Sequence, residues 1–263
     1  MIQLGVNSVL FKAYSFAEAA RAIALAGYDG VELSMIQGMC EHLDPHHYNR
    51  GEINAIMEAN GLKWLSAEVA SLDLERLKAC FEACADVGVP IVNVGPGGKS
   101  GVEEDFLRSA ETLQARAELA KTYGLTLCCK AHVGSAIYNT PTTLRAMELV
   151  TSDAFGVDMD PSHIHRAGEN PAEALPSIIS RVRHVHIRDC KGAGPAPGAP
   201  ALQACGRGDI DLYGYFKAMT DAKYDGPVCL EVIGPDQTMT EAAVIAAESY
   251  GYMNALLKLL GAR

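Results

Sequence analysis

Short apolar runs rich in β-branched residues alternate with longer amphipathic stretches from one end of the chain to the other. This alternation is typical of parallel strands joined by helices, because a parallel pair of strands needs a crossover connection. The runs predict eight strands, at residues 2–7, 30–34, 62–68, 91–95, 125–130, 155–160, 184–189 and 228–232. The length of 263 residues also suits a (β/α)8 barrel, which typically has about 250. We therefore predict a single α/β domain at residues 1–263, folded as a (β/α)8 TIM barrel.

The alternative architecture is an open, doubly wound sheet built from the same strand and helix units. Its usual nucleotide-binding fingerprint, Gly-x-Gly-x-x-Gly after the first strand, is absent, because Gly5-Val6-Asn7-Ser8 stands there. A closed barrel is therefore favoured. Its longest loop, residues 190–208, contains Gly-Ala-Gly-Pro-Ala-Pro-Gly-Ala-Pro and is predicted to be either a mobile lid or disordered.

The chain is acidic, with a net charge of -10, and it has no stripe of lysine or arginine. Such a surface repels a phosphate backbone, so we expect a small-molecule partner and no nucleic acid. No apolar run is long enough to span a bilayer, and the N-terminal residues have the pattern of a strand instead of a signal peptide. We expect no membrane association, whereas a homo-oligomer remains open.

Eight cysteines lie mostly inside apolar segments and form no Cys-x-x-Cys pair. We expect buried, reduced thiols instead of a disulfide framework or a thiolate zinc site. With no signal peptide expected, this cysteine usage predicts a cytoplasmic protein.

Polar residues gather at the carboxyl ends of the last four strands, where a barrel has its active site. Successive side chains of a strand point to opposite faces, so residues two apart share a face. The ionisable residues that oppose the apolar face are Lys130 and His132, Asp158 and Asp160, His184 and His186, and Glu231. We predict that Lys130, Asp160, His186 and Glu231 share one cavity. Two carboxylates and an imidazole there would suit Mn²⁺, Mg²⁺, Co²⁺ or Zn²⁺.

Asp158 and His184 lie two residues deeper in their strands, where burial without a polar partner costs several kcal/mol. We expect them to hydrogen-bond to each other or to water. Arg188 is expected to alternate away from His186. Glu32 and Glu68 end earlier strands, and we expect either contacts to ligand hydroxyls or salt bridges between loops.

Five segments follow one another along nearly the whole chain: Gly-Tyr-Asp-Gly-Val-Glu-Leu at 27–33, Asp-Pro-Ser-His at 160–163, His-Val-His-Ile-Arg-Asp at 184–189, Gly-Arg-Gly-Asp-Ile-Asp at 206–211 and Leu-Glu-Val at 230–232. In this order they resemble the xylose isomerase-like sugar isomerases and epimerases, which include ketose 3-epimerases, inosose dehydratases and dehydroshikimate dehydratases. The resemblance implies a divalent metal held by Glu, Asp, His and Glu at the ends of strands five to eight. Here it implies the metal ligands Asp160, His186 and Glu231.

The remaining ligand differs, because Lys130 stands where the family has its first glutamate. An ammonium cannot coordinate a cation, and two positive charges a few ångströms apart repel strongly at low dielectric. Three hypotheses follow. The metal stays on the other ligands while Lys130, with a lowered pKa, acts as acid or base; Lys130 replaces the positive charge of the metal; or Lys130 forms a Schiff base.

The resulting functional hypothesis is an enzyme that removes a proton next to the carbonyl of a sugar or polyol derivative, giving an enediolate. Isomerisation, epimerisation or dehydration can follow. Glu231 is the expected base, with Lys130 or a metal stabilising the oxyanion. Substrate contacts are expected from His132, His163, Arg188 and Arg207.

The resemblance also bears on the type of reaction. Its 3-epimerases use two glutamates on opposite faces of the substrate, so the loss of one favours dehydration or isomerisation. The alternative function is a catalytically inactive, sugar-binding barrel in which Lys130 replaces a metal ligand.

Overall fold

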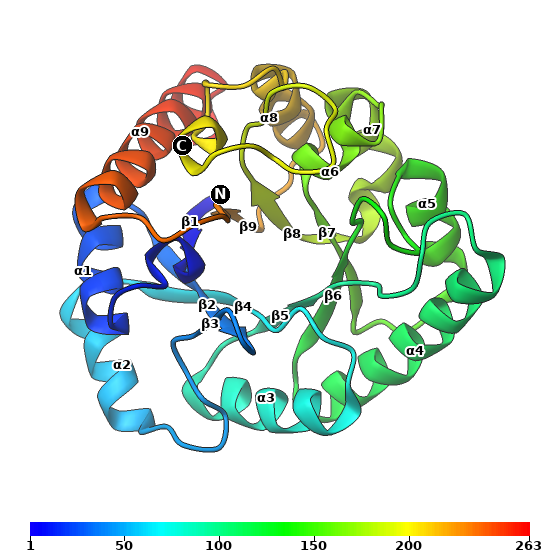
Figure 1. Ribbon diagram of the computed structural model, residues 1–263, viewed down its shortest axis with the longest axis horizontal. Coiled ribbons are helices and arrows are strands. Elements are labelled where there is room, and N and C mark those ends of the chain that lie inside the picture. Colours follow the sequence, from blue (N-terminus) through cyan, green and yellow to red (C-terminus); the bar gives the residue numbers. More distant parts are fainter.

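The computed structural model describes residues 1–263 and has a closed ring of parallel strands at its centre (Figure 1). The ring closes because β1 (Gln3–Asn7) pairs in parallel with both β2 (Gly30–Ile36) and β9 (Pro227–Leu230). Between β2 and β9 the ring continues through β4 (Lys63–Glu68), β5 (Ile91–Val94), β6 (Thr126–Lys130), β7 (Phe155–Met159) and β8 (Val182–Ile187). The predicted (β/α)8 barrel is confirmed, and the open sheet is excluded by this closure. The short strand β3 (Cys40–Glu41) pairs antiparallel with the end of β2 and is not part of the ring.

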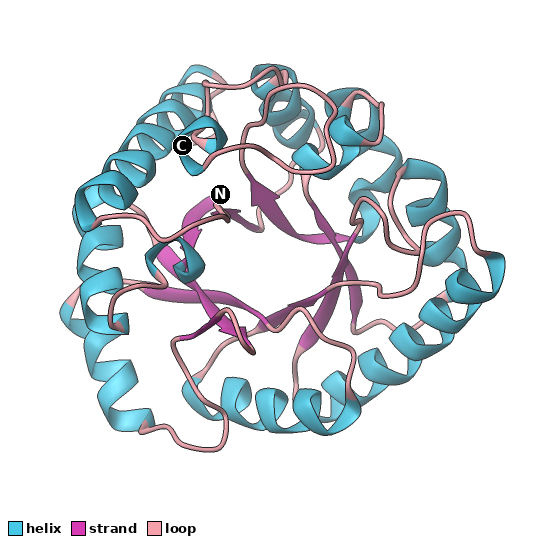
Figure 2. Cartoon of the chain, viewed as in Figure 1, coloured by secondary structure: helices cyan, strands magenta, loops and turns pink.

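Helices surround the ring on its outer side (Figure 2). They are α1 (Phe16–Ala26), α2 (Arg50–Ala59), α3 (Leu74–Val87), α4 (Glu103–Thr122), α5 (Thr140–Leu149), α6 (Pro161–Arg166), α7 (Pro171–Ile178), α8 (Leu212–Asp221) and α9 (Met239–Leu259). Local sequence signals set several of their ends. Ser15 and Glu18 form a capping box at the start of α1, and Gly27 ends it in the left-handed conformation, with φ of 101°.

The two faces of the strands differ in chemistry, as the alternation predicts. Apolar residues such as Leu127, Val157, Val185 and Leu230 belong to one continuous core cluster together with helix residues. The opposite face lines the interior of the barrel and carries the ionisable residues of the site. Strand ends differ from prediction by one to two residues at most positions; β7, for example, ends at Met159 because Asp160 caps α6.

Two glycines allow the strands to approach closely where the ring closes. Gly5 of β1 is the register partner of Gly30 of β2. A Cβ atom at Gly30 would lie 2.3 Å from the backbone oxygen of Lys63, and one at Gly5 would lie 2.6 Å from Leu65 Cδ1. A larger residue at Gly30 would have to push β4 away, whereas one at Gly5 would first displace the side chains of Leu65 and Cys229.

All eight cysteines are free and buried, as predicted. None of the helices has both the length and the apolar character that a membrane crossing demands.

The loop at residues 190–208 includes a short 3-10 helix, Pro200–Gln203, and contacts its surroundings. Gln203 Nε2 donates to the carbonyl of Ile233, and Arg166 Nη1 donates to that of Pro195. The loop therefore lies against the segment that follows β9.

Candidate active site

A cavity of about 370 Å³ opens at the carboxyl end of the barrel. It lies between the loops that follow the strands, where the fold has its functional face. The polar and charged side chains in its wall include Glu68, Lys130, His132, His163, Arg188 and Glu231. Five of these six were considered from the sequence as site residues, and Glu68 was left outside that set.

Lys130 is the centre of the site. Its Nζ lies 2.9 Å from Glu231 Oε1, 3.2 Å from Glu68 Oε1 and 3.3 Å from His186 Nδ1. These partners come from three other strands, so Lys130 points into the barrel as its parity predicted. Burial alone would lower the pKa of this ammonium, but the carboxylates of Glu231 and Glu68 outweigh burial and raise the pKa above its ordinary value. Lys130 is therefore a cation, which argues against a lysine with a lowered pKa.

Glu231 is held by two cations. Besides Lys130, the Nη1 atom of Arg188 lies 2.9 Å from Glu231 Oε2. Burial raises the pKa of this carboxyl, but the positive charges of Arg188 and Lys130 prevail and hold the pKa well below its ordinary value. Glu231 is therefore a carboxylate with weak basicity.

Glu68 has the opposite electrostatics. Its Oε2 accepts a hydrogen bond from Asn7 Nδ2 at 2.6 Å, and its Oε1 faces Lys130. Burial, followed by the negative charge of Glu231, raises the pKa of Glu68 to about 7. The sequence leaves the role of Glu68 open. Its alternation with Ser66 at the end of β4 is the signal that identifies it as a side chain of the barrel interior.

Arg188 points into the barrel, and the expectation that it alternates away from His186 is wrong. Residues 186 and 188 are two apart and so share a face. Arg188 is 1% exposed, and its Nη2 donates to Asp160 Oδ2 at 2.9 Å while its Nε donates to Ser162 Oγ at 2.8 Å. Arg188 thus links Asp160 to Glu231 across the end of the barrel.

Asp160 is a buried capping residue of α6. Its Oδ1 accepts from the backbone N of Ser162 at 2.8 Å and from its hydroxyl at 2.7 Å. Its other oxygen pairs with Arg188, and Asp160 does not line the cavity. Burial raises the pKa of Asp160, but Arg188 prevails and lowers it below its ordinary value.

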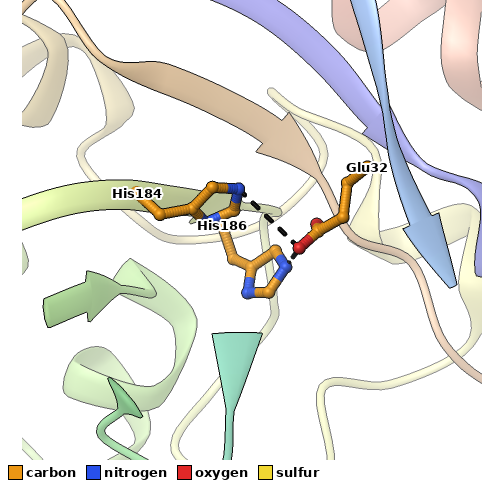
Figure 3. Close-up of side chains that lie close together, drawn as sticks. All are labelled: Glu32, His184 and His186. Atoms are coloured by element: carbon orange, nitrogen blue, oxygen red, sulfur yellow. Dashed lines mark hydrogen bonds and ion pairs between the residues drawn. The ribbon is translucent and has the colours of Figure 1, made fainter. Parts of the chain in front are cut away.

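Beneath the cavity, His186 lies between two carboxylates. Its Nε2 is 2.6 Å from Glu32 Oε2 (Figure 3), and its Nδ1 is 2.6 Å from Asp158 Oδ2. Burial would lower the pKa of His186, but Asp158 and Glu32 raise it well above its ordinary value. His186 is therefore an imidazolium, and Lys130 at 3.3 Å is a neighbouring cation.

His184 completes this deeper layer. Its Nδ1 lies 2.9 Å from Asp158 Oδ1, and its Nε2 lies 2.9 Å from Ser66 Oγ. The prediction that Asp158 and His184 hydrogen-bond to each other is confirmed. Asn93 joins the layer by donating to Glu32 Oε1 at 2.5 Å. The layer joins Glu32, Asp158, His184 and His186 beneath the cavity, and Asn93 Oδ1 is a buried oxygen in it without a hydrogen-bond partner.

Two histidines stand on the cavity wall, as expected. The ring centroids of His132 and His163 are 4.2 Å apart. His132 is exposed, whereas His163 is 2% exposed. Burial holds the pKa of His163 well below its ordinary value and lowers that of His132, so both are neutral near pH 7. A neutral imidazole can donate a hydrogen bond to one hydroxyl group and accept a hydrogen bond from another.

Arg207 is not brought to the cavity. Its Nε donates to Glu248 Oε1 of α9 at 2.7 Å, and its side chain is 40% exposed. The sequence predicts a substrate contact for this arginine. The structure instead gives it a surface partner on the last helix.

Two groups of three side chains have the chemistry and spacing of metal ligands. They are Glu68, His186 and Glu231, and Glu32, His184 and His186, with the ligand atoms of each group within 4.8 Å of one another. Asp160 is in neither group. The ligand set that the sequence resemblance implied, Asp160, His186 and Glu231, is therefore not the set that the structure brings together.

The model of the xylose isomerase-like TIM barrels matches residues 20–255 of the chain. The chain belongs to this family. Within it, the inosose dehydratase of Clostridium perfringens is 24% identical over 262 residues, covering 84% of each protein. The resemblance that the sequence segments suggested is thus confirmed.

Solved structures of two other proteins share the fold. The D-allulose 3-epimerase from Methylomonas sp. has a TM-score of 0.78 at 16% identity, covering 97% of this chain and 98% of that one. The IOLI protein with a bound zinc atom has a TM-score of 0.79 at 19% identity, with coverage of 97% and 98%. The proteins that this chain resembles thus include ones named as a dehydratase and an epimerase, and one with a bound zinc atom.

The ligand groups of this xylose isomerase-like barrel do not fit a resident cation in their present arrangement. The Nζ atom of Lys130 lies within hydrogen-bonding distance of all three members of the group Glu68, His186 and Glu231. In the other group, His184 already uses both ring nitrogens on Asp158 and Ser66.

Proposed function

We propose that this chain is an enzyme that removes a proton next to the carbonyl of a small sugar or polyol derivative and forms an enediolate. One observation carries this proposal: the Lys130 ammonium faces the cavity together with two carboxylates, Glu68 and Glu231. A fixed cation beside a carboxylate is the minimum that enolisation needs, because one group takes the proton and the other stabilises the developing oxyanion.

The substrate class is supported by the cavity and by the relatives. A cavity of about 370 Å³ has room for a molecule of sugar size. The relatives are an inosose dehydratase and a D-allulose 3-epimerase, whose names refer to a cyclic polyol ketone and a ketose. We assign His132 to the substrate hydroxyls, since it is neutral and exposed on the cavity wall, whereas both ring nitrogens of His163 already contact Arg166 and Arg188.

Lys130 is assigned to the carbonyl oxygen. Its ammonium has three donors, and two of them face the carboxylates of Glu68 and Glu231, which leaves the third for the substrate oxygen. As the oxygen becomes negative in the transition state, its attraction to the ammonium grows, and this preference for the transition state is what accelerates the reaction. Arg188 stands beside Lys130 on the same wall and adds a second positive charge.

Glu68 is the better base, in place of Glu231, which the sequence had favoured. A group that accepts a proton works best when its pKa lies near the working pH, and the pKa of Glu68 is about 7. Glu231 is paired with Lys130 and Arg188, and these two positive charges weaken its basicity. Its role is to position the two cations. The proton moves from the substrate carbon to Glu68, and the electron pair of that bond forms the enediolate.

The fate of the enediolate decides the reaction. Return of the proton from Glu68 to the neighbouring carbon is isomerisation, and return of a proton to the opposite face of the original carbon is epimerisation. Loss of a hydroxyl group from the next carbon, protonated by Glu68 so that it leaves as water, is dehydration. All three share the first proton transfer, so the first step is the one to test.

The test is exchange of substrate hydrogen for deuterium in D₂O, followed by proton NMR, with a panel of ketoses and inososes. We expect loss of the signal of the hydrogen next to the carbonyl for at least one compound with wild type. Exchange should be lost in Lys130→Ala and Glu68→Gln and retained in Lys258→Ala, a change at an exposed lysine of α9. Absence of exchange across the panel would contradict the proposal.

The second candidate, an inactive sugar-binding barrel, is favoured by one observation, the presence of Lys130 among the side chains of metal-ligand type. The same panel separates the two functions. Saturable binding of a compound by calorimetry, without exchange of its hydrogens, would identify a binding protein.

A further inference from the structure

We infer that the side chains of Lys130 and Arg188 together take the place of a divalent cation in this cavity, so that the site holds its ligand without a bound metal ion. This inference rests on the proposed function only in assigning the substrate to this cavity. Its test measures metal binding, which is independent of turnover.

The first argument is position. Glu68, His186 and Glu231 offer ligand atoms within 4.8 Å of one another, which is the spacing of a metal site. Lys130 Nζ lies among them, at 3.2, 3.3 and 2.9 Å from one atom of each. A divalent ion bound to the same atoms at about 2.0–2.6 Å would come within a few ångströms of the ammonium. At low dielectric the ion and the ammonium would repel each other strongly.

The second argument is the state of His186. Both of its ring nitrogens lie 2.6 Å from carboxylate oxygens, of Glu32 and of Asp158. Nε2 is hydrogen-bonded to Glu32, and Nδ1 also faces the Lys130 ammonium at 3.3 Å, so a metal at either nitrogen would have to displace a partner that is already in contact. To become a ligand, His186 would have to lose one of two short contacts inside a fully buried layer.

The third argument is the occupation of the carboxylates. Asp160 accepts from Ser162 with one oxygen and from Arg188 with the other. Glu231 faces Lys130 with one oxygen and Arg188 with the other. The two cations therefore cover the oxygens that the family resemblance assigns to a metal.

The fourth argument is charge. Lys130 and Arg188 carry one positive charge each, and together they equal the charge of one divalent cation. They are held on β6 and directly after β8, so their separation is fixed by the barrel and not by an exchangeable ion. The carboxylates they face are neutralised without a metal.

The test begins with wild-type protein dialysed against a chelator and titrated with Mn²⁺ by calorimetry and by electron paramagnetic resonance. We expect no saturable site at millimolar Mn²⁺ and no metal in stoichiometric amount after purification without chelator. One tightly held ion per chain in the wild type would overturn the inference, whatever the variants do.

Lys130→Glu should create the site, because it removes the ammonium and adds a carboxylate beside Glu68 and Glu231. We expect Mn²⁺ affinity to rise by about a hundredfold or more. Lys258→Glu makes the same change of charge at an exposed position of α9 and should bind Mn²⁺ as wild type does. Equal affinity in both variants would overturn the inference.

If Lys130→Glu fails to fold, Lys130→Gln provides the comparison, with a smaller expected gain because it removes only the repulsive charge. Deuterium exchange by the chelated wild type separates the two proposals. Exchange without metal supports both. If the protein binds no metal and exchanges no substrate hydrogen, the metal-free site is supported and the proposed enzymatic function is contradicted. If exchange occurs only after a metal ion binds, the proposed function is supported and the metal-free site is overturned.

Discussion

The ammonium of Lys130 on β6 lies 3.2 Å from the carboxylate of Glu68 on β4, inside the barrel. The contact joins a cation to an acid whose pKa is raised to about 7, mainly by burial and by the charge of Glu231. The stability of the protein and the chemistry of the cavity therefore depend on the same proton.

The first prediction concerns stability against pH. Folded Glu68 holds its proton more tightly than unfolded Glu68, so between about pH 4.5 and 7 the folded state binds more protons and the contribution of Glu68 falls as pH rises. Relative to Glu68→Gln, which mimics the protonated acid, wild type should lose roughly 3 kcal/mol across that window. Urea unfolding at a series of pH values measures this. Glu75→Gln is the control, because the side chain of Glu75 is 79% exposed. The prediction is contradicted if the difference in free energy of unfolding between wild type and Glu68→Gln stays constant with pH.

The second prediction is that Lys130→Ala both destabilises the fold and stops the chemistry. Removal of the ammonium leaves Glu68 and Glu231 buried with one cation fewer, which should cost about 3–5 kcal/mol. Deuterium exchange should fall by about a hundredfold to a thousandfold, since an oxyanion donor is lost. Urea denaturation and the NMR assay check the two parts. Lys258→Ala should change stability by no more than about 0.5 kcal/mol, and a similar small change in Lys130→Ala would mean that the ammonium is not buried among carboxylates.

The third prediction tests the imidazolium. Asp158→Asn removes one of the two carboxylates that raise the pKa of His186, so the pKa of His186 should fall towards its ordinary value. NMR titration of the imidazole, assigned with His186→Gln, measures this. Stability should fall by about 3 kcal/mol. Asp153→Asn, at a carboxylate that is 75% exposed, should leave the titration of His186 unchanged.

The fourth prediction concerns closure of the ring. Gly30→Ala would set a Cβ atom 2.3 Å from the Lys63 carbonyl, so the strands must separate, at a cost of about 1–3 kcal/mol or more. Gly251→Ala lies in α9 with no atom within 4 Å of the new Cβ, and it should stabilise by about 0.5–1 kcal/mol. Thermal unfolding of the pair should shift in opposite directions. Two shifts of the same sign would contradict the close approach of β1, β2 and β4.

The fold could be predicted from sequence because its signals are local. The alternation of strand and helix patterns, and the length of the chain, need no knowledge of distant contacts. The inward direction of Lys130, Asp158, His184 and Glu231 followed from parity in the same way. Arg188 was misassigned although parity would have placed it beside His186. Asn7, Glu32, Glu68 and Asn93 were not tested for parity, although they occupy the same face of the first four strands.

The pairings across the barrel could not be predicted, because they depend on how strands shift against one another. The register between β2 and β4 shifts at Val31 and Glu32, and the register between β7 and β8 shifts at Val157 and Asp158. These irregularities decide which carboxylates meet His186. Asp160 illustrates a second limit. Its side chain turns back to cap α6, and no pattern within the strand distinguishes a capping carboxylate from a metal ligand.

The pairing of β1 with β9 brings together two segments made at opposite ends of protein synthesis. While the chain leaves the ribosome, β1 and β2 can pair early, but the other edge of β1 has no partner until residues 227–230 have been made. Until then the chain is an open sheet whose edge strands expose unpaired backbone groups, and Lys130 lacks one of its two carboxylates. Folding intermediates of this protein should therefore be most prone to aggregate late in translation, and truncated chains that lack the last strand should depend on chaperones.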